Sequence, residues 1–123
     1  MKVILSVALG GSLGALSRYY STLFFNTVKP GFPLGTLFVN LSGSFFLGFL
    51  ISWSARAHIP AEARLFLMTG FLGAFTTFST YAAESMYLLK SGQIKPFIMN
   101  IALNTFLGLT AAAAGMYAGE AVL

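Results

Sequence analysis

Four apolar segments, each long enough to cross a lipid bilayer, occupy most of this 123-residue chain. The segments cover residues 3–25, 34–54, 65–89 and 97–119. A helix needs about 20 apolar residues to span the hydrocarbon core of a membrane. Because lipid offers no hydrogen bonds to the backbone, each segment is predicted to be a helix. We therefore expect an all-α integral membrane protein with a single four-helix domain over residues 1–123.

The composition excludes most enzymatic chemistry. Only 8% of the residues are charged, and the chain has no cysteine, one histidine and three acidic residues. Thiol catalysis, disulfides and thiolate metal sites are thereby excluded, and few groups remain for acid–base catalysis. The lysines and arginines are scattered, which gives no basic cluster for nucleic acid. We expect a protein that is not an enzyme and does not bind nucleic acid.

The start of the chain has an alternative interpretation as a secretory signal. Lys2 precedes an apolar stretch, and small residues follow near Ala15 and Ser17. However, apolar character resumes at once from Tyr19 onward, with no polar boundary. We therefore interpret residues 3–25 as a first membrane helix.

The distribution of positive charge gives no preferred orientation in the membrane. The short polar connections at 26–33, 55–64 and 90–96 make successive helices antiparallel and place both termini on one side. The two sides then carry Lys2, Arg56 and Arg64 against Lys29, Lys90 and Lys95, with Arg18 added to the second if it reaches that face. Orientation depends on an imbalance of such charges. Either the balance is chance in a small protein, or the chain inserts both ways and pairs as an antiparallel homodimer.

The third segment contains the strongest signal for a functional site. Two glycines, Gly70 and Gly73, precede a run of hydroxyl side chains: Thr76, Thr77, Ser79 and Thr80. Such side chains bond to nearby backbone and compete with helical hydrogen bonds. We predict a helix broken in the middle of the membrane, whose freed carbonyls could be ligands to a cation.

Aromatic residues follow the same segment at helical spacing. Phe78 and Tyr81 are three residues apart, and Phe71 and Phe75 extend the stripe. Such a stripe is usually packing. Alternatively, the positive edges of the rings, together with the hydroxyls of Ser79 and Thr80, could line a path for an anion. An anion would then lose its water without meeting a full positive charge that traps it.

The remaining polar residues of the apolar segments each have two interpretations. Arg18 either extends its guanidinium to the headgroups or attracts anions to a vestibule. Asn40 is either a hydrogen bond between helices or part of a site. Asn100 and Asn104 share a face of the fourth segment with Gly108, which is typical of close packing. We assign these last three no ion contact.

These residues together resemble the Fluc (CrcB) family of fluoride channels. The resemblance covers essentially the whole chain and rests on GGSLGALSRY, GTLFVN and GFLGAFTTFSTYAAE, in the order of the family. It implies a dual-topology antiparallel homodimer with two fluoride pores and a sodium ion at its centre. It also implies passive, electrogenic export of fluoride across the cytoplasmic (inner) membrane of a prokaryote, which protects the cell from fluoride.

The resemblance assigns roles to individual residues. The fluoride path would include Asn40, Phe78 and Tyr81, with hydroxyls from Ser79, Thr80 and Thr36. The vestibule would include Arg18 and Glu84. The backbone carbonyls of Gly73 and Thr76, from both subunits, would be the ligands of sodium.

The chain departs from the family pattern at three positions. Tyr81 stands where the family usually has a second phenylalanine, Ala82 where serine is common, and Ala74 where a second glycine is frequent. The tyrosine keeps the positive ring edge but adds a hydroxyl that could hold an ion more tightly. We expect conduction to persist at a changed rate.

Two other classes of protein compete with the channel. A small proton-coupled multidrug exporter has the same size and topology, but it needs a membrane-embedded carboxylate. Glu84, near the end of the third segment, is the one candidate. A membrane protein without transport activity, which assembles with a partner, is the third class. The short polar connections leave little surface for such a partner.

Overall fold

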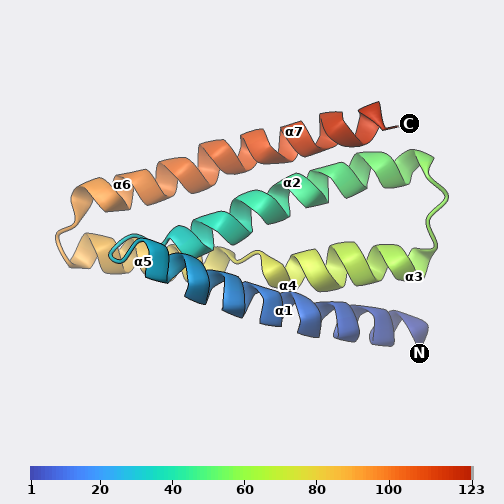
Figure 1. The fold of residues 1–123 in the computed structure, drawn as a ribbon, viewed down its shortest axis with the longest axis horizontal. Helices are drawn as coiled ribbons and strands as arrows, with labels where there is room; N and C mark the ends of the chain where they lie inside the picture. The colour runs from blue at the N-terminus through green and yellow to red at the C-terminus, as the bar shows by residue number, and fades with distance from the viewer. Residues whose placement is uncertain (123) are drawn as a thin grey trace.

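The computed structural model describes residues 1–122, and their regular structure is entirely helical. Four helical rods run antiparallel to their neighbours in sequence, and both termini lie at the same end of the molecule (Figure 1). The first two rods are the helices α1 (Lys2–Val28) and α2 (Leu34–Arg56). The third comprises α3 (Ala61–Arg64), η1 (Leu65–Leu72), α4 (Gly73–Phe75) and α5 (Phe78–Lys90). The fourth comprises α6 (Ile94–Ala102), η2 (Leu103–Leu107) and α7 (Gly108–Ala121). The prediction of an all-α protein with four helices is therefore confirmed.

Three of the rods are long and apolar enough to cross a membrane: Leu34–Arg56, Ala61–Lys90 and Ile94–Ala121. The helix α1 has 27 residues but is not among them. Its length is sufficient, and its serines and Arg18 lower its hydropathy. The length and apolar composition of these three rods therefore make the chain a multi-pass membrane protein.

The rods begin and end close to the predicted boundaries. The largest difference is at the start of the third rod, which begins at Ala61 instead of residue 65. The first rod ends at Val28 instead of residue 25, and the fourth begins at Ile94 instead of residue 97. The predicted connection 90–96 includes Pro96. Proline is tolerated in the first turn of a helix, where the backbone N–H groups have no helical partner. Pro96 therefore belongs to the first turn of α6.

Glycines allow the rods to approach each other closely. A Cβ atom on Gly14 of α1 would collide with the carbonyl oxygen of Phe71 in η1. Similarly, a Cβ atom on Gly115 of α7 would collide with the carbonyl oxygen of Phe45 in α2. These two seams join α1 to the third rod and α2 to the fourth. Between them lies a small core of Val39, Leu72 and Phe75.

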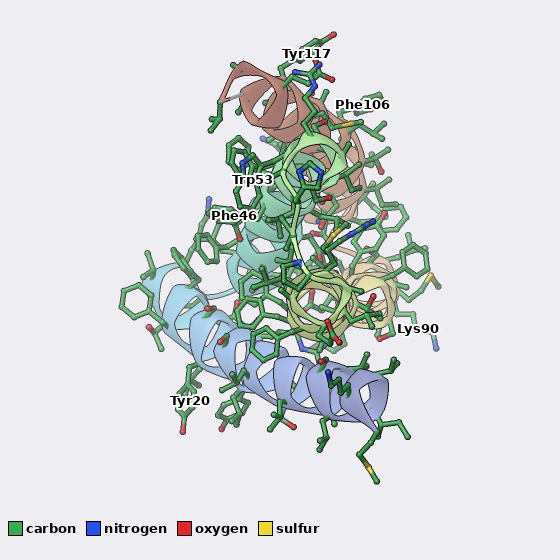
Figure 2. All side chains as sticks on the ribbon, turned by 90° about the vertical axis from the view of Figure 1, so that its right-hand side faces the viewer. Tyr20, Phe46, Trp53, Lys90, Phe106 and Tyr117 are labelled. Atoms are coloured by element: carbon green, nitrogen blue, oxygen red, sulfur yellow. The ribbon has the colours of Figure 1, made fainter. Side chains whose placement is uncertain are left out.

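The outer surface of the molecule is apolar and rich in aromatic residues. Tyr20, Phe106 and Tyr117 project outward from the rods (Figure 2), and each is more than half exposed. Such a surface would be unfavourable in water but suits the hydrocarbon core and its aromatic interfaces.

Two wider stretches of helix, η1 and η2, have hydrogen bonds in the π register. The π-type turn is rare and occurs frequently at functional sites. In this chain, only the short helix α4 separates η1 from the segment 76–77, and η2 contains Asn104. Both stretches therefore adjoin the candidate site.

Candidate functional site

The third rod changes to extended backbone at two residues between α4 and α5. Thr76 has φ −79° and ψ 155°, and Thr77 has φ −149° and ψ 113°. Both the backbone N–H and the hydroxyl of Thr76 donate to the carbonyl of Leu72, at 3.1 and 3.0 Å. The helix then restarts at Phe78, where the hydroxyl oxygen of Thr77 accepts a 3.2 Å hydrogen bond from the backbone N–H of Thr80. This is the bond of a helix N-cap.

Asn40 of α2 holds this extended segment in place. Its Oδ1 accepts a 2.8 Å hydrogen bond from the backbone N–H of Thr77, and its Nδ2 donates to the Thr77 carbonyl at 3.2 Å. The side-chain amide therefore bonds to both backbone groups of one residue, as a neighbouring β-strand would. Asn40 compensates for the helical bonds that Thr77 lacks, which is required of a polar backbone away from water.

The end of α4 carries carbonyl oxygens that have lost their helical donors. The N–H that would bond to the Gly73 carbonyl in a continuous helix belongs to Thr77, and it donates to Asn40. Among the hydrogen bonds that the described residues make outside the helices, none joins a backbone N–H to the carbonyl of Thr76. The last carbonyls of a helix carry partial negative charge. The two carbonyls named by the resemblance therefore have the chemistry that a small cation requires. In residues 1–122, no cluster of three acidic or histidine side chains offers another metal site.

The aromatic stripe is divided by the extended segment. Phe71 and Phe75 stack on each other with ring centroids 5.8 Å apart, and Phe75 belongs to the buried core. Phe78, on the other side of the break, is 78% exposed, and its ring centroid lies 5.6 Å from that of Tyr81. The packing interpretation thus holds for Phe71 and Phe75. Phe78 and Tyr81 instead line an open groove.

This groove, of about 490 Å³, runs between the second, third and fourth rods. We call it the central groove, and its polar lining includes Asn40, Ser44, Thr76, Thr77, Tyr81, Asn104 and Thr105. Ser79 and Thr80 do not line it, but they are exposed at the start of α5. Thr77 connects the two sets, because its hydroxyl donates to the Thr80 hydroxyl at 2.9 Å and lies 3.4 Å from the Ser79 hydroxyl. Two of the hydroxyls predicted for the fluoride path, those of Ser79 and Thr80, are therefore linked through Thr77.

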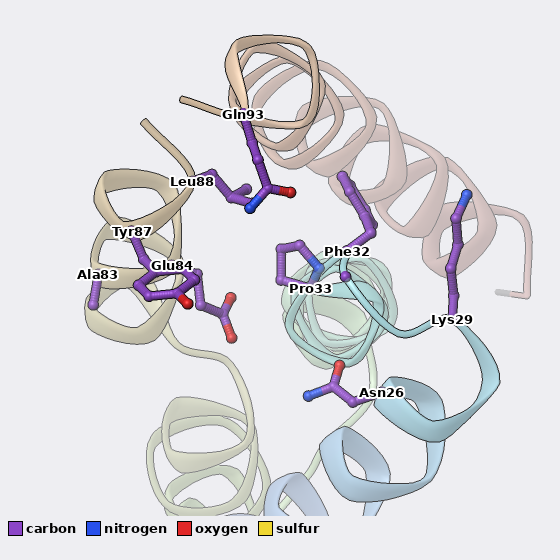
Figure 3. A pocket seen from close by; sticks show the side chains of 10 residues that line it. Asn26, Lys29, Phe32, Pro33, Ala83, Glu84, Tyr87, Leu88 and Gln93 are labelled. Carbon is purple, nitrogen blue, oxygen red and sulfur yellow. The ribbon is translucent and has the colours of Figure 1, made fainter. Parts of the chain in front are cut away.

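A second cavity, of about 610 Å³, lies at the end of the molecule that carries the connection 29–33. Glu84 and Lys29 both line it, on opposite sides of Pro33 (Figure 3). Oε1 of Glu84 accepts a 2.9 Å hydrogen bond from the hydroxyl of Thr36, which is 1% exposed. Oε2 of Glu84 is buried without a partner in the described residues. The structure thus joins Thr36 to the vestibule residue Glu84, whereas the resemblance placed it near the path itself.

Arg18 lies in α1, is partly buried, and lines neither cavity among the described residues. The structure therefore does not bring it together with Glu84. Its role in the vestibule stays a prediction.

The sequence pattern assigns no individual role to four residues of the site. They are Thr77, Ser85, Asn100 and Asn104, which extend the hydrogen bonds around Asn40. Asn104 donates its amide hydrogens to the backbone carbonyl and the Oδ1 of Asn100, at 2.9 and 3.0 Å, and Asn100 is fully buried. The spacing of Asn100 and Asn104 did place them on one face. A pattern within one helix, however, does not reveal which other helix that face contacts.

Comparison with known proteins agrees with this architecture. Residues 5–116 match the model of a family described as "CrcB-like protein, Camphor Resistance (CrcB)". A protein of Bacteroides fragilis named "Fluoride-specific ion channel FluC" is 43% identical over 124 residues, which cover 98% of both chains. Proteins with the same name from Legionella pneumophila (strain Lens) and Campylobacter fetus are 47% and 45% identical, over 97% and 86% of this chain and 90% and 84% of theirs. The match to the family model and these identities show that the chain belongs to the CrcB family.

Proposed function

We propose that this protein is a fluoride-selective channel that carries out passive, electrogenic export of fluoride from the cytoplasm. The relatives named as fluoride channels support the choice of ion. The observation that carries the proposal is the central groove, where amide, hydroxyl and aromatic groups meet at the break in the third rod. Within residues 1–122, no charged side chain lines this groove.

The chemistry of the groove suits a small, strongly hydrated anion. Such an ion must exchange its water for many weak donors if it is to pass without being trapped. The hydroxyls of Thr77, Ser79 and Thr80 can rotate their hydrogens toward an anion. Phe78 and Tyr81 add ring edges with partial positive charge. No one of these groups holds the ion with the strength of an arginine or a metal.

A single subunit leaves much of this site uncovered. Phe78, Ser79, Thr80 and Gly73 are all exposed. Hydroxyls and unpaired carbonyls facing lipid in mid-membrane are unfavourable. A second copy of the chain in the opposite orientation would cover them. We infer a dual-topology antiparallel homodimer with two pores, in which all four rods cross the membrane and the break in the third lies near its middle.

Sodium at the dimer centre would be bound by the Gly73 and Thr76 carbonyls of both subunits. This assignment is supported by the Thr77 N–H, which donates to Asn40 and not to the Gly73 carbonyl, and by the absence of a backbone donor to Thr76 among the bonds outside the helices of the described residues. A bound cation neutralises the partial negative charge at two converging helix ends. We expect fluoride efflux to fall when the protein is purified and reconstituted with N-methylglucamine in place of sodium, and to recover on dialysis into sodium.

The function is tested by reconstitution into liposomes loaded with potassium fluoride. A fluoride electrode would follow efflux, with valinomycin added to relieve the membrane potential. Fast efflux that requires valinomycin and is absent for chloride establishes a selective, electrogenic channel. Efflux no faster than from empty liposomes, with protein that is folded, would contradict the proposal. Proton-coupled uptake of a cationic drug would instead indicate the multidrug exporter.

Two variants distinguish an effect on conduction from an effect on folding. Phe78→Ile should abolish most of the efflux, because an aliphatic side chain has no positive ring edge. Phe106→Ile, at an exposed aromatic position on the fourth rod that lines neither cavity, is the matched control. The control should conduct as the parent does.

A further inference from the structure

Asn40 has no amide hydrogen to spare for an anion in the structure. One N–H donates to the carbonyl of Thr77 at 3.2 Å, and the other donates to Oδ1 of Asn104 at 2.9 Å. A neutral amide has two donors. An anion that binds to Asn40 must therefore replace one of these two acceptors.

The two acceptors differ in how easily they leave. Thr77 is bound twice, because its N–H also donates to Oδ1 of Asn40 at 2.8 Å. If an anion took the N–H that now bonds to the Thr77 carbonyl, that carbonyl would lose its partner at the break in the third rod. Asn104, in contrast, makes one bond to Asn40, and no backbone group loses its partner when that bond breaks. Asn104 and Asn40 also line the same groove. Asn104 is the acceptor that an anion can displace.

The orientation of Asn104 is set by a chain of hydrogen bonds beyond it. Its Nδ2 donates to both oxygens of Asn100, and Nδ2 of Asn100 donates to the hydroxyl of Ser85 at 3.0 Å. Ser85 in turn donates to the backbone carbonyl of Tyr81 at 2.7 Å. Every donor points the same way, from Asn40 toward Tyr81. A flipped Asn104 would place its NH₂ against the NH₂ of Asn40 and its oxygen against two oxygens of Asn100. The oxygen of Asn104 must therefore face Asn40.

We propose that Asn104 is a positioning residue whose amide oxygen competes with the anion for one N–H of Asn40. The inference rests on the proposed function and adds a residue to it. When an anion binds to Asn40, the oxygen of Asn104 loses its hydrogen bond from the Asn40 N–H. When that hydrogen bond re-forms, it helps to release the ion. Weak binding of this kind is what rapid conduction requires.

The variant Asn104→Ala tests the competition. Without the competing oxygen, the half-saturating fluoride concentration for efflux should fall by roughly two- to tenfold, the range that one net hydrogen bond spans. The maximal rate per folded dimer should fall with it, because release becomes slower. An unchanged or raised half-saturating concentration overturns the proposal. A purely structural role would lower the maximal rate alone.

Three controls make the result specific. Thr110→Val removes a hydroxyl of the fourth rod that bonds only to its own helix, at the carbonyl of Phe106, and should leave both parameters unchanged. Asn104→Leu keeps the branched shape of the side chain without its amide and should behave as Asn104→Ala does. In an Asn40→Ala background, Asn104→Ala should have no further effect on the half-saturating concentration. Effects that multiply would show that Asn104 acts without Asn40, and would overturn the proposal.

A spectroscopic measurement on the parent protein avoids any question of folding. The chain has four asparagines, Asn26, Asn40, Asn100 and Asn104, so ¹⁵N-asparagine labelling gives few side-chain amide signals. Fluoride, but not chloride, should shift the signals of Asn40 and Asn104 together. A shift of Asn40 alone would overturn the competition. If the parent conducts but Asn104→Ala leaves the half-saturating concentration unchanged, only this inference is refuted. If the parent does not conduct, the proposed function is refuted as well.

Discussion

At the scale of single residues, Tyr81 is the departure from the family pattern with the clearest consequence. Its ring lies beside Phe78 in the central groove, and no hydrogen bond to its hydroxyl is found in the described residues. The hydroxyl is therefore free to donate to an ion in the groove. Removing it should weaken binding while leaving the ring edge in place.

We expect Tyr81→Phe to raise the half-saturating fluoride concentration by roughly two- to tenfold, the effect of one net hydrogen bond. The maximal efflux rate should rise, because the ion leaves more easily. Concentration-dependent efflux from liposomes measures both quantities. Identical values in parent and variant would mean that the ion contacts the ring edge and not the hydroxyl.

The pair of Thr36 and Glu84 gives a second test at this scale. The Thr36 hydroxyl is the partner of Oε1, and Oε2 is already buried without one. Thr36→Val has nearly the same shape and removes the hydroxyl, so it should destabilise the carboxylate by about 1–3 kcal/mol. The carboxylate will then change its position in the cavity, and we expect slower fluoride efflux.

Thr36→Ser, which retains the hydroxyl, should conduct as the parent does. If the valine and serine variants conduct equally, the hydrogen bond does not matter to the path.

At the scale of structural elements, the extended segment between α4 and α5 depends on two side chains, Asn40 and Thr77. Thr77 caps α5, and loss of a threonine cap costs about 1 kcal/mol. Thr77→Ala should therefore destabilise the protein modestly and remove the hydroxyl that links Ser79 and Thr80. Thermal unfolding in detergent and fluoride efflux would both be measured.

Thr77→Ser keeps the cap and should restore both properties. Loss of stability with unchanged efflux in Thr77→Ala would show that the linked hydroxyls are not part of the path.

The sequence predicted these elements unevenly, for physical reasons. Hydropathy and turn residues determine where membrane helices lie, so the number of rods and their approximate ends followed from the pattern. The run of hydroxyl side chains at 76–80 indicates the segment in which the backbone is extended. The partners of that segment, Asn40 and Asn104, come from other rods. Contacts between rods depend on rotation about each helix axis, and no periodicity within one rod specifies it. The division of the aromatic stripe into a buried and an exposed part also depends on rotation about the helix axis, which the sequence pattern does not specify.

At the scale of the whole molecule, the charges at the two ends of the rods bear on orientation. Lys2 begins α1, Arg56 ends α2 and Arg64 ends α3, whereas Lys29 follows α1, Lys90 ends α5 and Lys95 lies in the first turn of α6. The first set of helix ends lies at the end of the molecule that carries the termini, and the second set lies at the other (Figure 1). Lys2 is also 3.8 Å from Glu62, so one of the positive charges is partly neutralised. Small changes in this balance should decide the orientation, because the positive-inside rule acts on differences in lysine and arginine.

Two biased variants follow from this balance. Ala57→Lys with His58→Lys adds charge at the end with the termini, and Ser91→Lys with Gln93→Lys adds charge at the opposite end. All four positions lie in the connections between rods or at helix ends, outside the central groove. Each variant should insert in one orientation, opposite to the other. A reporter fused to the C-terminus measures the orientation of each variant.

If the working unit is an antiparallel dimer, each biased variant alone should lose most of its fluoride efflux, because a partner in the opposite orientation is absent. Co-expression of the two variants should restore efflux and give dimers that contain one of each. The restoration is decisive, since a variant that merely misfolds cannot be rescued by another that misfolds. Conversely, a variant that inserts in a single orientation and still conducts as the parent does would refute the antiparallel dimer. The exposed face of Phe78, Ser79 and Thr80 would then have to be covered by a parallel copy, and the carbonyls of the two subunits could not converge from opposite sides of the membrane.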